Sequence, residues 1–157
     1  PKKVIDRGDP YQWQVEKTCD AVIAALDDKG FSGLDWQVCY QSRVGPLEWI
    51  GPATEDAIID AGRDGRGVVL APIAFVSEHS ETLVELDIDY RELAEKNGLS
   101  HYARVPTVGT NKEFIEGLAN IVRKALRWDD RVAGCGVGDG ARCCPRRFHV
   151  CGHGTVP

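Results

Sequence analysis

The sequence predicts an α/β protein, a three-layer α/β/α sandwich around a parallel sheet. Helical and strand-like segments alternate along the first 127 residues in the order α-β-α-β-α-β-α. Such alternation implies parallel βαβ units with right-handed crossovers. The run "VVLAPIAF" is apolar almost throughout, as in a parallel strand that is covered on both faces. In this fold class, ligands bind beyond the carboxyl ends of the strands.

The first half of the chain supplies two helices and one strand. The first helix follows Asp9, an N-cap residue before Pro10, and ends at Gly30. Its apolar residues recur at helical spacing: Val15, Cys19, Val22, Ile23 and Leu26. Residues 35–42, "DWQVCYQS", are predicted to form a strand. Residues 51–65 form a helix with acids in its first turn, where the helix dipole favours them.

The second half repeats the alternation. Residues 66–75 are the second strand, and an acidic helix follows them. Residues 101–109 form a weaker third strand. The last helix, residues 110–128, opens with a capping box from Thr110 to Glu113. Its predicted core stripe is Phe114, Leu118, Ile121, Val122 and Ala125.

Composition limits the class of partner. The chain is 43% hydrophobic and 27% charged, as is ordinary for a globular protein. A net charge of -5 argues against nucleic acid, which requires a basic patch. No apolar run approaches the roughly 18 to 20 residues that span a bilayer. We expect a cytoplasmic protein that is at most peripheral to a membrane. The chain starts at Pro1 and contains no Met, which suggests a piece of a longer protein.

The stretch "SEHSETLVELDIDY" places acids and a histidine just beyond the second strand. At α-helical pitch, Leu83, Leu86, Tyr90 and Leu93 share one face that would pack on the sheet. Glu81, Glu85 and Asp89 then fall on the opposite face, with Glu92 beside them. One interpretation is a solvated face. The other is a line of carboxylates that accepts a divalent cation or protons, with His79 and Glu81 at the strand end.

Four motifs together resemble ferrochelatase, the enzyme that inserts ferrous iron into a porphyrin: "RGDPY", "YQSRVGPLEWIGP", "PIAFVSEHSETLVELDIDY" and "NKEFIEGLANIVRKAL". The resemblance covers about residues 1–127. It implies a chelatase-like fold of two similar lobes with a porphyrin cleft between them. Residues 1–130 would be the C-terminal lobe, residues 131–157 a Cys-rich tail, and the missing N-terminal lobe the chain's partner.

The resemblance also implies roles for particular residues. The family's catalytic histidine would lie directly before Pro1, outside this chain. Glu81 and His79 are implied as catalytic, and the acidic helix is implied to be a π-helix. The implied ligands of the substrate Fe²⁺ are Glu81, Glu85 and Asp89. The implied porphyrin-binding residues are Tyr11, Arg43, Trp49 and Phe75.

The cysteines divide into two groups. Cys19 and Cys39 are predicted to be small buried hydrophobic residues. The tail holds Cys135, Cys143, Cys144 and Cys151. Some ferrochelatases carry a [2Fe-2S] cluster on C-terminal cysteines, and four cysteines are its usual ligand set. Zinc held with His149 and His153, or free thiols, are the alternatives.

Three functions compete at this point. The first is insertion of ferrous iron into protoporphyrin or coproporphyrin, the terminal step of haem biosynthesis. The second is a chelatase for another metal, such as cobalt or nickel, or another tetrapyrrole. The third is a non-catalytic iron- or haem-binding module.

Overall fold

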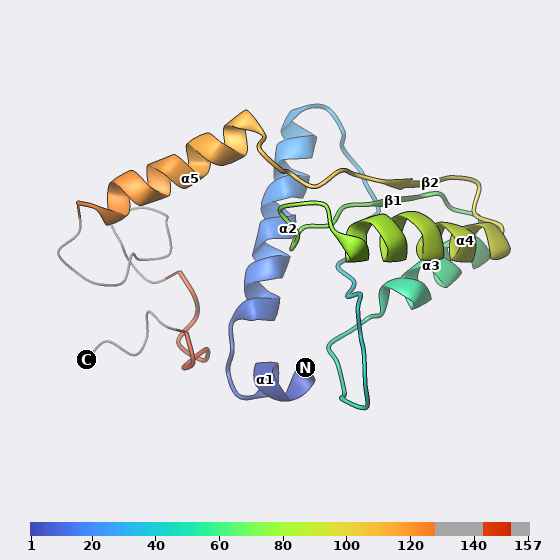
Figure 1. Ribbon diagram of the computed structural model, residues 1–157, viewed down its shortest axis with the longest axis horizontal. Helices are drawn as coiled ribbons and strands as arrows, with labels where there is room; N and C mark the ends of the chain where they lie inside the picture. The colour runs from blue at the N-terminus through green and yellow to red at the C-terminus, as the bar shows by residue number, and fades with distance from the viewer. Residues whose placement is uncertain (128–142, 152–157) are drawn as a thin grey trace. The chain divides into compact units, whose positions relative to one another are not determined.

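The computed structural model of the chain describes residues 1–127 and 143–151. It forms two compact units: Pro1 with Val15–Gly109, and Lys2–Gln14 with Thr110–Pro157. Figure 1 shows helices together with a small sheet, so the predicted α/β class is confirmed. The first unit contains the sheet and the whole acidic segment.

The sheet of the first unit has two parallel strands, β1 (Val68–Leu70) and β2 (Tyr102–Arg104). Both lie inside the segments predicted as strands, and the helical connection between them is the predicted crossover. Each strand is shorter than expected. Pro72 and Pro106 follow the two strands and cannot donate a backbone hydrogen bond, so the ladder cannot extend past them.

The strand predicted at residues 35–42 is wrong. These residues are all described and form only an isolated parallel bridge between Tyr40 and Ala53. Tyr40 N donates to Pro52 O at 2.9 Å, and Thr54 N donates to Tyr40 O at 3.0 Å. Residues 35–42 have strand propensity, but a strand also needs a neighbouring strand, and Tyr40 pairs instead with residues at the start of α3.

The core of the first unit joins two helices to the sheet. The helices are α3 (Thr54–Arg63) and α4 (Tyr90–Lys96). The buried apolar residues of this cluster are Ile58, Leu86, Tyr90, Ala94 and Tyr102. Gly62 of α3 lies against the end of α4, where an added Cβ would sit 2.5 Å from the Asn97 carbonyl oxygen. Only glycine allows this approach.

The acidic segment is a π-helix, η1 (Glu81–Asp89), which continues directly into α4. The π-helix implied by the resemblance is therefore observed. The buried residues recur at every fourth position: Thr82, Leu86, Tyr90 and Ala94. Thr82 and Leu86 lie in η1, and Tyr90 and Ala94 lie in α4, so one buried stripe runs through both helices.

The wider winding overturns part of the predicted face assignment. Leu83, which α-helical pitch placed on the sheet, is 49% exposed. Glu81, Glu85 and Asp89 each precede a member of the buried stripe by one residue. The acids therefore run beside the buried face rather than opposite it.

The first predicted helix corresponds to α2 (Tyr11–Asp28), preceded by the short α1 (Lys2–Asp6). Asp9 Oδ1 accepts a hydrogen bond from Tyr11 N at 2.8 Å, as expected of an N-terminal cap. Gly30 ends the helix with a φ of 88°, in the left-handed region that favours glycine.

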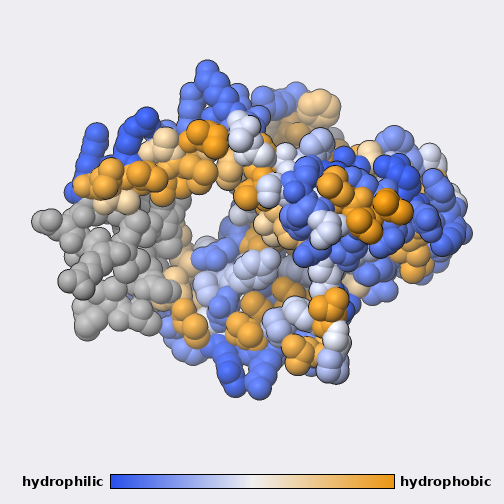
Figure 2. Space-filling model, in the orientation of Figure 1, coloured by the Kyte–Doolittle hydropathy of each residue, from blue (hydrophilic) through white to orange (hydrophobic). Residues whose placement is uncertain are grey.

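The last predicted helix corresponds to α5 (Lys112–Ala125), but its cap is Asn111 rather than Thr110. Asn111 Oδ1 accepts from Glu113 N at 3.0 Å and from Phe114 N at 3.4 Å. Within the described part of the chain, α5 has no buried residue, and its apolar stripe is visible along the helix in Figure 2. Leu118, Ile121 and Val122 are 44% to 56% exposed.

Residues 143–151 of the second unit contain a small apolar cluster. Cys144, Phe148 and Cys151 are buried, and Trp13 packs against them. The Trp13 and Phe148 rings are 5.9 Å apart. The cysteines of this segment therefore occupy hydrophobic positions.

Candidate carboxylate site on the π-helix

Glu85, in the middle of η1, accepts hydrogen bonds from four donors. Ser42 supplies two, its backbone N at 3.0 Å and its Oγ at 2.7 Å. Gln41 Nε2 lies at 3.2 Å, and Tyr90 Oη at 2.9 Å. Burial and the Glu85 carboxylate raise the pKa of Tyr90 far above its ordinary value, so the phenol remains a donor. This number of donors fixes the position of one carboxylate.

Ser42 connects Glu85 to Glu81. Its Oγ lies 2.7 Å from an oxygen of each carboxylate. A hydroxyl has one hydrogen and can donate to only one of them at a time, so a proton held on either carboxyl would complete the second bond. Ser42 also has a φ of 54°, unusual for a residue other than glycine. Its backbone strain coincides with the hydrogen bonds to Glu85, as is typical of functional sites.

Contacts with Phe75 and with the first turn of η1 orient His79. Glu81 N donates to His79 Nδ1 at 3.2 Å, and the Phe75 ring meets the imidazole edge-on with centroids 4.5 Å apart. Thr82 Oγ1 accepts from His79 N at 2.9 Å and donates to His79 O at 3.0 Å. Because Nδ1 accepts a hydrogen bond, the neutral ring carries its proton on Nε2. In this tautomer Nε2–H can donate a hydrogen bond and has no lone pair free to bind a metal.

The three predicted metal ligands are not equivalent. Glu81 and Glu85 meet at Ser42, whereas Asp89 is exposed at the last residue of η1. Across residues 1–127 and 143–151, no three His, Cys, Asp or Glu side chains are grouped as a metal-ion site would require. The described acids form a line with one hydroxyl bridge rather than a closed coordination shell.

The predicted porphyrin-binding residues lie on separate elements. Phe75 contacts His79, and Trp49 Nε1 donates to Val44 O at 3.1 Å, which closes a loop after Ser42. Arg43 is exposed in the same loop. Tyr11 starts α2 in the second unit and is 47% exposed.

Three residues at the site were missed from the sequence: Ser42, Gln41, and Tyr90 as a donor. Ser42 is the last residue of the segment predicted as the first strand, and ligands bind beyond the carboxyl ends of strands in this fold class, so its position was a usable signal. Tyr90 was assigned to the core alone, although its hydroxyl reaches Glu85.

A second charged group borders the π-helix. Arg104 of β2 binds both carboxylate oxygens of Asp87 and, at 2.6 Å, Glu78 Oε1. Glu78 Oε1 also accepts from Thr107 N at 2.9 Å. The hydrogen bonds from Thr107, Thr82 and Arg104 lower the pKa of Glu78 from 4.5 to about 2.

This lowered pKa makes a testable contribution to stability. A carboxyl whose pKa is lower in the folded state stabilises the fold above its unfolded pKa and loses that contribution as pH falls through its folded pKa. Glu78→Gln should therefore lower the melting temperature at pH 7, and the difference from the parent should shrink between pH 4.5 and about 2. Thermal denaturation across this range measures it. A constant difference at all pH values would contradict the assignment.

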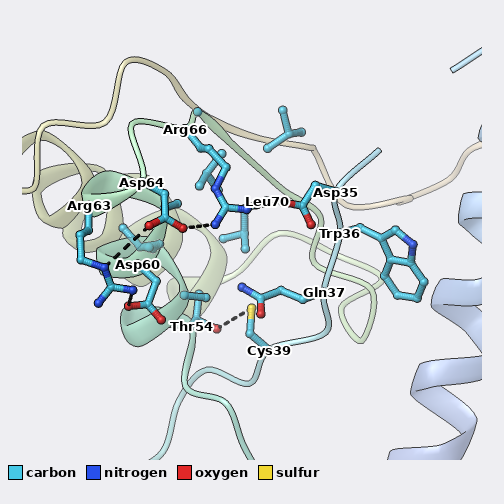
Figure 3. Close-up of a pocket in the computed structure, with 16 residues that line it drawn as sticks. Asp35, Trp36, Gln37, Cys39, Thr54, Asp60, Arg63, Asp64, Arg66 and Leu70 are labelled. Carbon is cyan, nitrogen blue, oxygen red and sulfur yellow. Dashed lines mark hydrogen bonds and ion pairs between the residues drawn. The ribbon is translucent and has the colours of Figure 1, made fainter. Parts of the chain in front are cut away.

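A cavity of about 780 Å³ lies elsewhere in the first unit, between residues 35–39, α3 and β1 (Figure 3). Its rim carries exposed ion pairs between Arg66 and Asp35 and between Arg63 and Asp60. Exposed pairs of this kind contribute little stability. None of the predicted site residues lines the cavity.

The cysteines give no ligand set among the described residues. Cys19 and Cys39 are half-buried free thiols, and burial raises the pKa of each, so both remain protonated. Cys144 Sγ accepts a hydrogen bond from Gln14 Nε2 at 3.5 Å. Cys135, predicted as a ligand, and His153 lie outside the described residues. The described tail cysteines therefore do not by themselves fit a cluster or zinc site.

None of the described helices is both long enough and apolar enough to cross a membrane.

Comparison with known proteins identifies the family. The ferrochelatase family model matches residues 1–126. A ferrochelatase of Caulobacter vibrioides is 58% identical over 126 residues, covering 80% of this chain and 35% of that protein. One of Pelagibacter ubique is 53% identical, covering 79% of this chain and 35% of its own length. One of Rickettsia bellii is 48% identical over 151 residues, covering 96% of this chain and 42% of that protein.

The chain spans 35% to 43% of the length of the curated relatives that it matches. The family match covers the π-helix, Ser42 and every predicted residue of the carboxylate site. On the family model and these identities, the chain belongs to the ferrochelatase family.

Proposed function

We propose that the complete protein containing this chain inserts ferrous iron into a porphyrin, with Glu81 as a catalytic residue. The observation that carries the proposal is the hydrogen-bonded line from Glu81 through Ser42 to Glu85 on a π-helix. The relatives that are named ferrochelatases support the reaction assigned to it.

The chemistry requires groups of this kind. Metallation strips water from the substrate iron and removes two protons from the pyrrole nitrogens. A carboxylate can bind the metal or accept a proton, and the Ser42 hydroxyl can pass a proton from Glu81 to Glu85. Asp89, exposed at the end of the line, is proposed to exchange protons or iron with solvent.

His79 is proposed as a catalytic residue that donates a hydrogen bond, rather than as an iron ligand. Its Nδ1 lone pair accepts the Glu81 N–H, which leaves Nε2–H as the group available to a substrate. The edge-on Phe75 ring restricts the rotation of the imidazole. The family's other catalytic histidine, implied to precede Pro1, would face Glu81 across the porphyrin.

Tyr11, Trp49 and Phe75 are proposed as apolar walls for the flat macrocycle, and Arg43 as a partner for a propionate. A flat apolar ligand requires aromatic surfaces. We also propose that residues 1–130 form the C-terminal lobe, that the N-terminal lobe completes the cleft, and that the enzyme is cytoplasmic.

Porphyrin fluorescence under anaerobic conditions tests the function. The complete enzyme should quench it in the presence of Fe²⁺ and either protoporphyrin or coproporphyrin, with formation of the haem absorption spectrum. Faster insertion of Co²⁺ or Ni²⁺ than of Fe²⁺ would favour the alternative chelatase. Binding of iron or haem without insertion would favour a non-catalytic module.

The tail has its own test. A [2Fe-2S] cluster on Cys135, Cys143, Cys144 and Cys151 would have to draw Cys144 and Cys151 out of their apolar packing. If it forms, anaerobically purified enzyme is red-brown, and Cys144→Ser or Cys151→Ser bleaches it. Colourless protein with bound zinc supports the zinc alternative, and metal-free protein supports free thiols.

A further inference from the structure

Arg104 is a nearly buried cation beside the carboxylate site. Its side chain is 8% exposed. The guanidinium forms a two-point contact with Asp87, in which Nε donates to Oδ1 at 2.8 Å and Nη2 to Oδ2. Nη1 donates to Glu78 Oε1 at 2.6 Å. Bidentate contacts of this kind are the strongest hydrogen bonds available to arginine.

The two partners of Arg104 bracket the site along the chain. Glu78 lies three residues before Glu81, and Asp87 lies two residues after Glu85. Glu78 is fixed to the end of β2 a second time through Thr107 N. One guanidinium from the sheet therefore ties the entry of η1 to its second half.

A hydrogen bond to a core residue also holds the second half of η1. Tyr102 Oη donates to Leu86 O at 2.7 Å, and Leu86 is fully buried. Asp87, the next residue, is thereby directed toward β2, where Arg104 lies. If residues 81–89 wound as an α-helix, each residue would rotate further about the axis, and Asp87 could not meet Arg104 while Glu78 also did.

A π-helix is rare and needs contacts outside the helix to persist. We propose that Arg104 is a positioning residue that holds η1 in its π winding and so sets the distance of Glu81 and Glu85 from Ser42. The consequence for turnover rests on the proposed function. The consequence for the winding of η1 does not.

Arg91 provides a matched control. It is an arginine on the same helical segment, and it bonds Asp87 O at 3.2 Å and Tyr102 O at 3.4 Å. It is exposed, and it contacts two backbone carbonyls and the Tyr102 ring rather than hydrogen-bonding a carboxylate. Arg91→Gln thus removes a neighbouring charge without removing the contact between Glu78 and Asp87.

The experiment compares Arg104→Gln, Arg104→Lys and Arg91→Gln in the complete enzyme, well below their melting temperatures. We expect kcat for iron insertion to fall by about ten- to a hundredfold in Arg104→Gln, the range for losing a partner that orients an active-site group. Arg104→Lys should lose less activity, since lysine keeps the positive charge but cannot form the two-point contact with Asp87. Arg91→Gln should remain near the parent.

Amide hydrogen exchange supplies a readout that does not depend on catalysis. The amides of Glu85 to Asp89 should exchange faster in Arg104→Gln than in the parent, and Arg91→Gln should leave them unchanged. If Arg104→Gln does not fold, Arg104→Lys is compared with the parent in both kcat and amide exchange. A lower melting temperature with unchanged kcat and unchanged η1 exchange would reduce Arg104 to a fold stabiliser and overturn the proposal.

The two proposals fail differently. If the parent enzyme inserts no iron, the proposed function fails, and the exchange data alone decide the role of Arg104. If the parent is active and Arg104→Gln keeps normal turnover and η1 protection, only the positioning role fails.

Discussion

Replacing Glu81 with Gln in the complete enzyme should lower the rate of iron insertion by about 10² or more, the scale of losing one general base. The change preserves side-chain volume but removes a negative charge and a proton acceptor. It also interrupts the proposed proton path at its first residue, since an amide cannot accept a proton from the substrate and pass it to the Ser42 hydroxyl. Anaerobic turnover and melting temperature, measured on the same sample, separate loss of chemistry from loss of fold.

Two neutralisations farther along η1 are the controls. Asp89→Asn is exposed and should cost about tenfold or less in turnover. Glu85→Gln should cost about tenfold in turnover and, unlike Asp89→Asn, about 1–3 kcal/mol in stability, because an amide NH₂ would confront some of the four donors that now bond Glu85.

A merely solvated acidic face predicts a different pattern. All three neutralisations would then leave turnover unchanged and alter stability by under about 0.5 kcal/mol, through relief of repulsion between like charges. Near-normal turnover in Glu81→Gln would contradict the assignment of Glu81 as a catalytic residue.

The helices were predictable where local signals define them. Asp9 and Gly30 bound α2 through a cap and a left-handed glycine, both of which are properties of the residues themselves. The cap of α5 was misplaced by one residue because Thr110 and Asn111 are both good caps, and only the hydrogen bonds identify Asn111. The strand at residues 35–42 failed because strand formation depends on a distant neighbour.

The acidic residues of the site were predictable from the sequence, but their hydrogen-bond partners were not. The position of Glu81 beyond a buried strand, and its spacing from Glu85, follow from the sequence and the fold class. The π winding does not follow from apolar periodicity, since the exposure of Leu83 distinguishes it only after the structure is known. Ser42 and Arg104 reach the site from 39 and 17 residues away, respectively, through contacts that no local pattern encodes.

The described chain leaves much apolar surface uncovered. Its first unit buries a core of five side chains, and α2 and α5 contain no buried residue. Exposed contiguous apolar surface marks an interface or a surface normally covered by another part of the protein. This pattern agrees with a chain that spans 35% to 43% of its relatives' length.

Residues 1–157 expressed alone should therefore insert no iron at a measurable rate. The carboxylate line from Glu81 to Glu85 is present. Under the proposed function, the flat macrocycle lies in a cleft between two lobes, and the resemblance implies that the histidine opposing Glu81 precedes Pro1. Porphyrin fluorescence with Fe²⁺ measures turnover of the isolated chain. Adding the remainder of the enzyme as a separate chain to residues 1–157 should restore turnover. The same addition to residues 1–157 that carry Glu81→Gln should not. Turnover by the isolated chain would show that one lobe suffices, and restoration despite Glu81→Gln would place the essential carboxylate elsewhere.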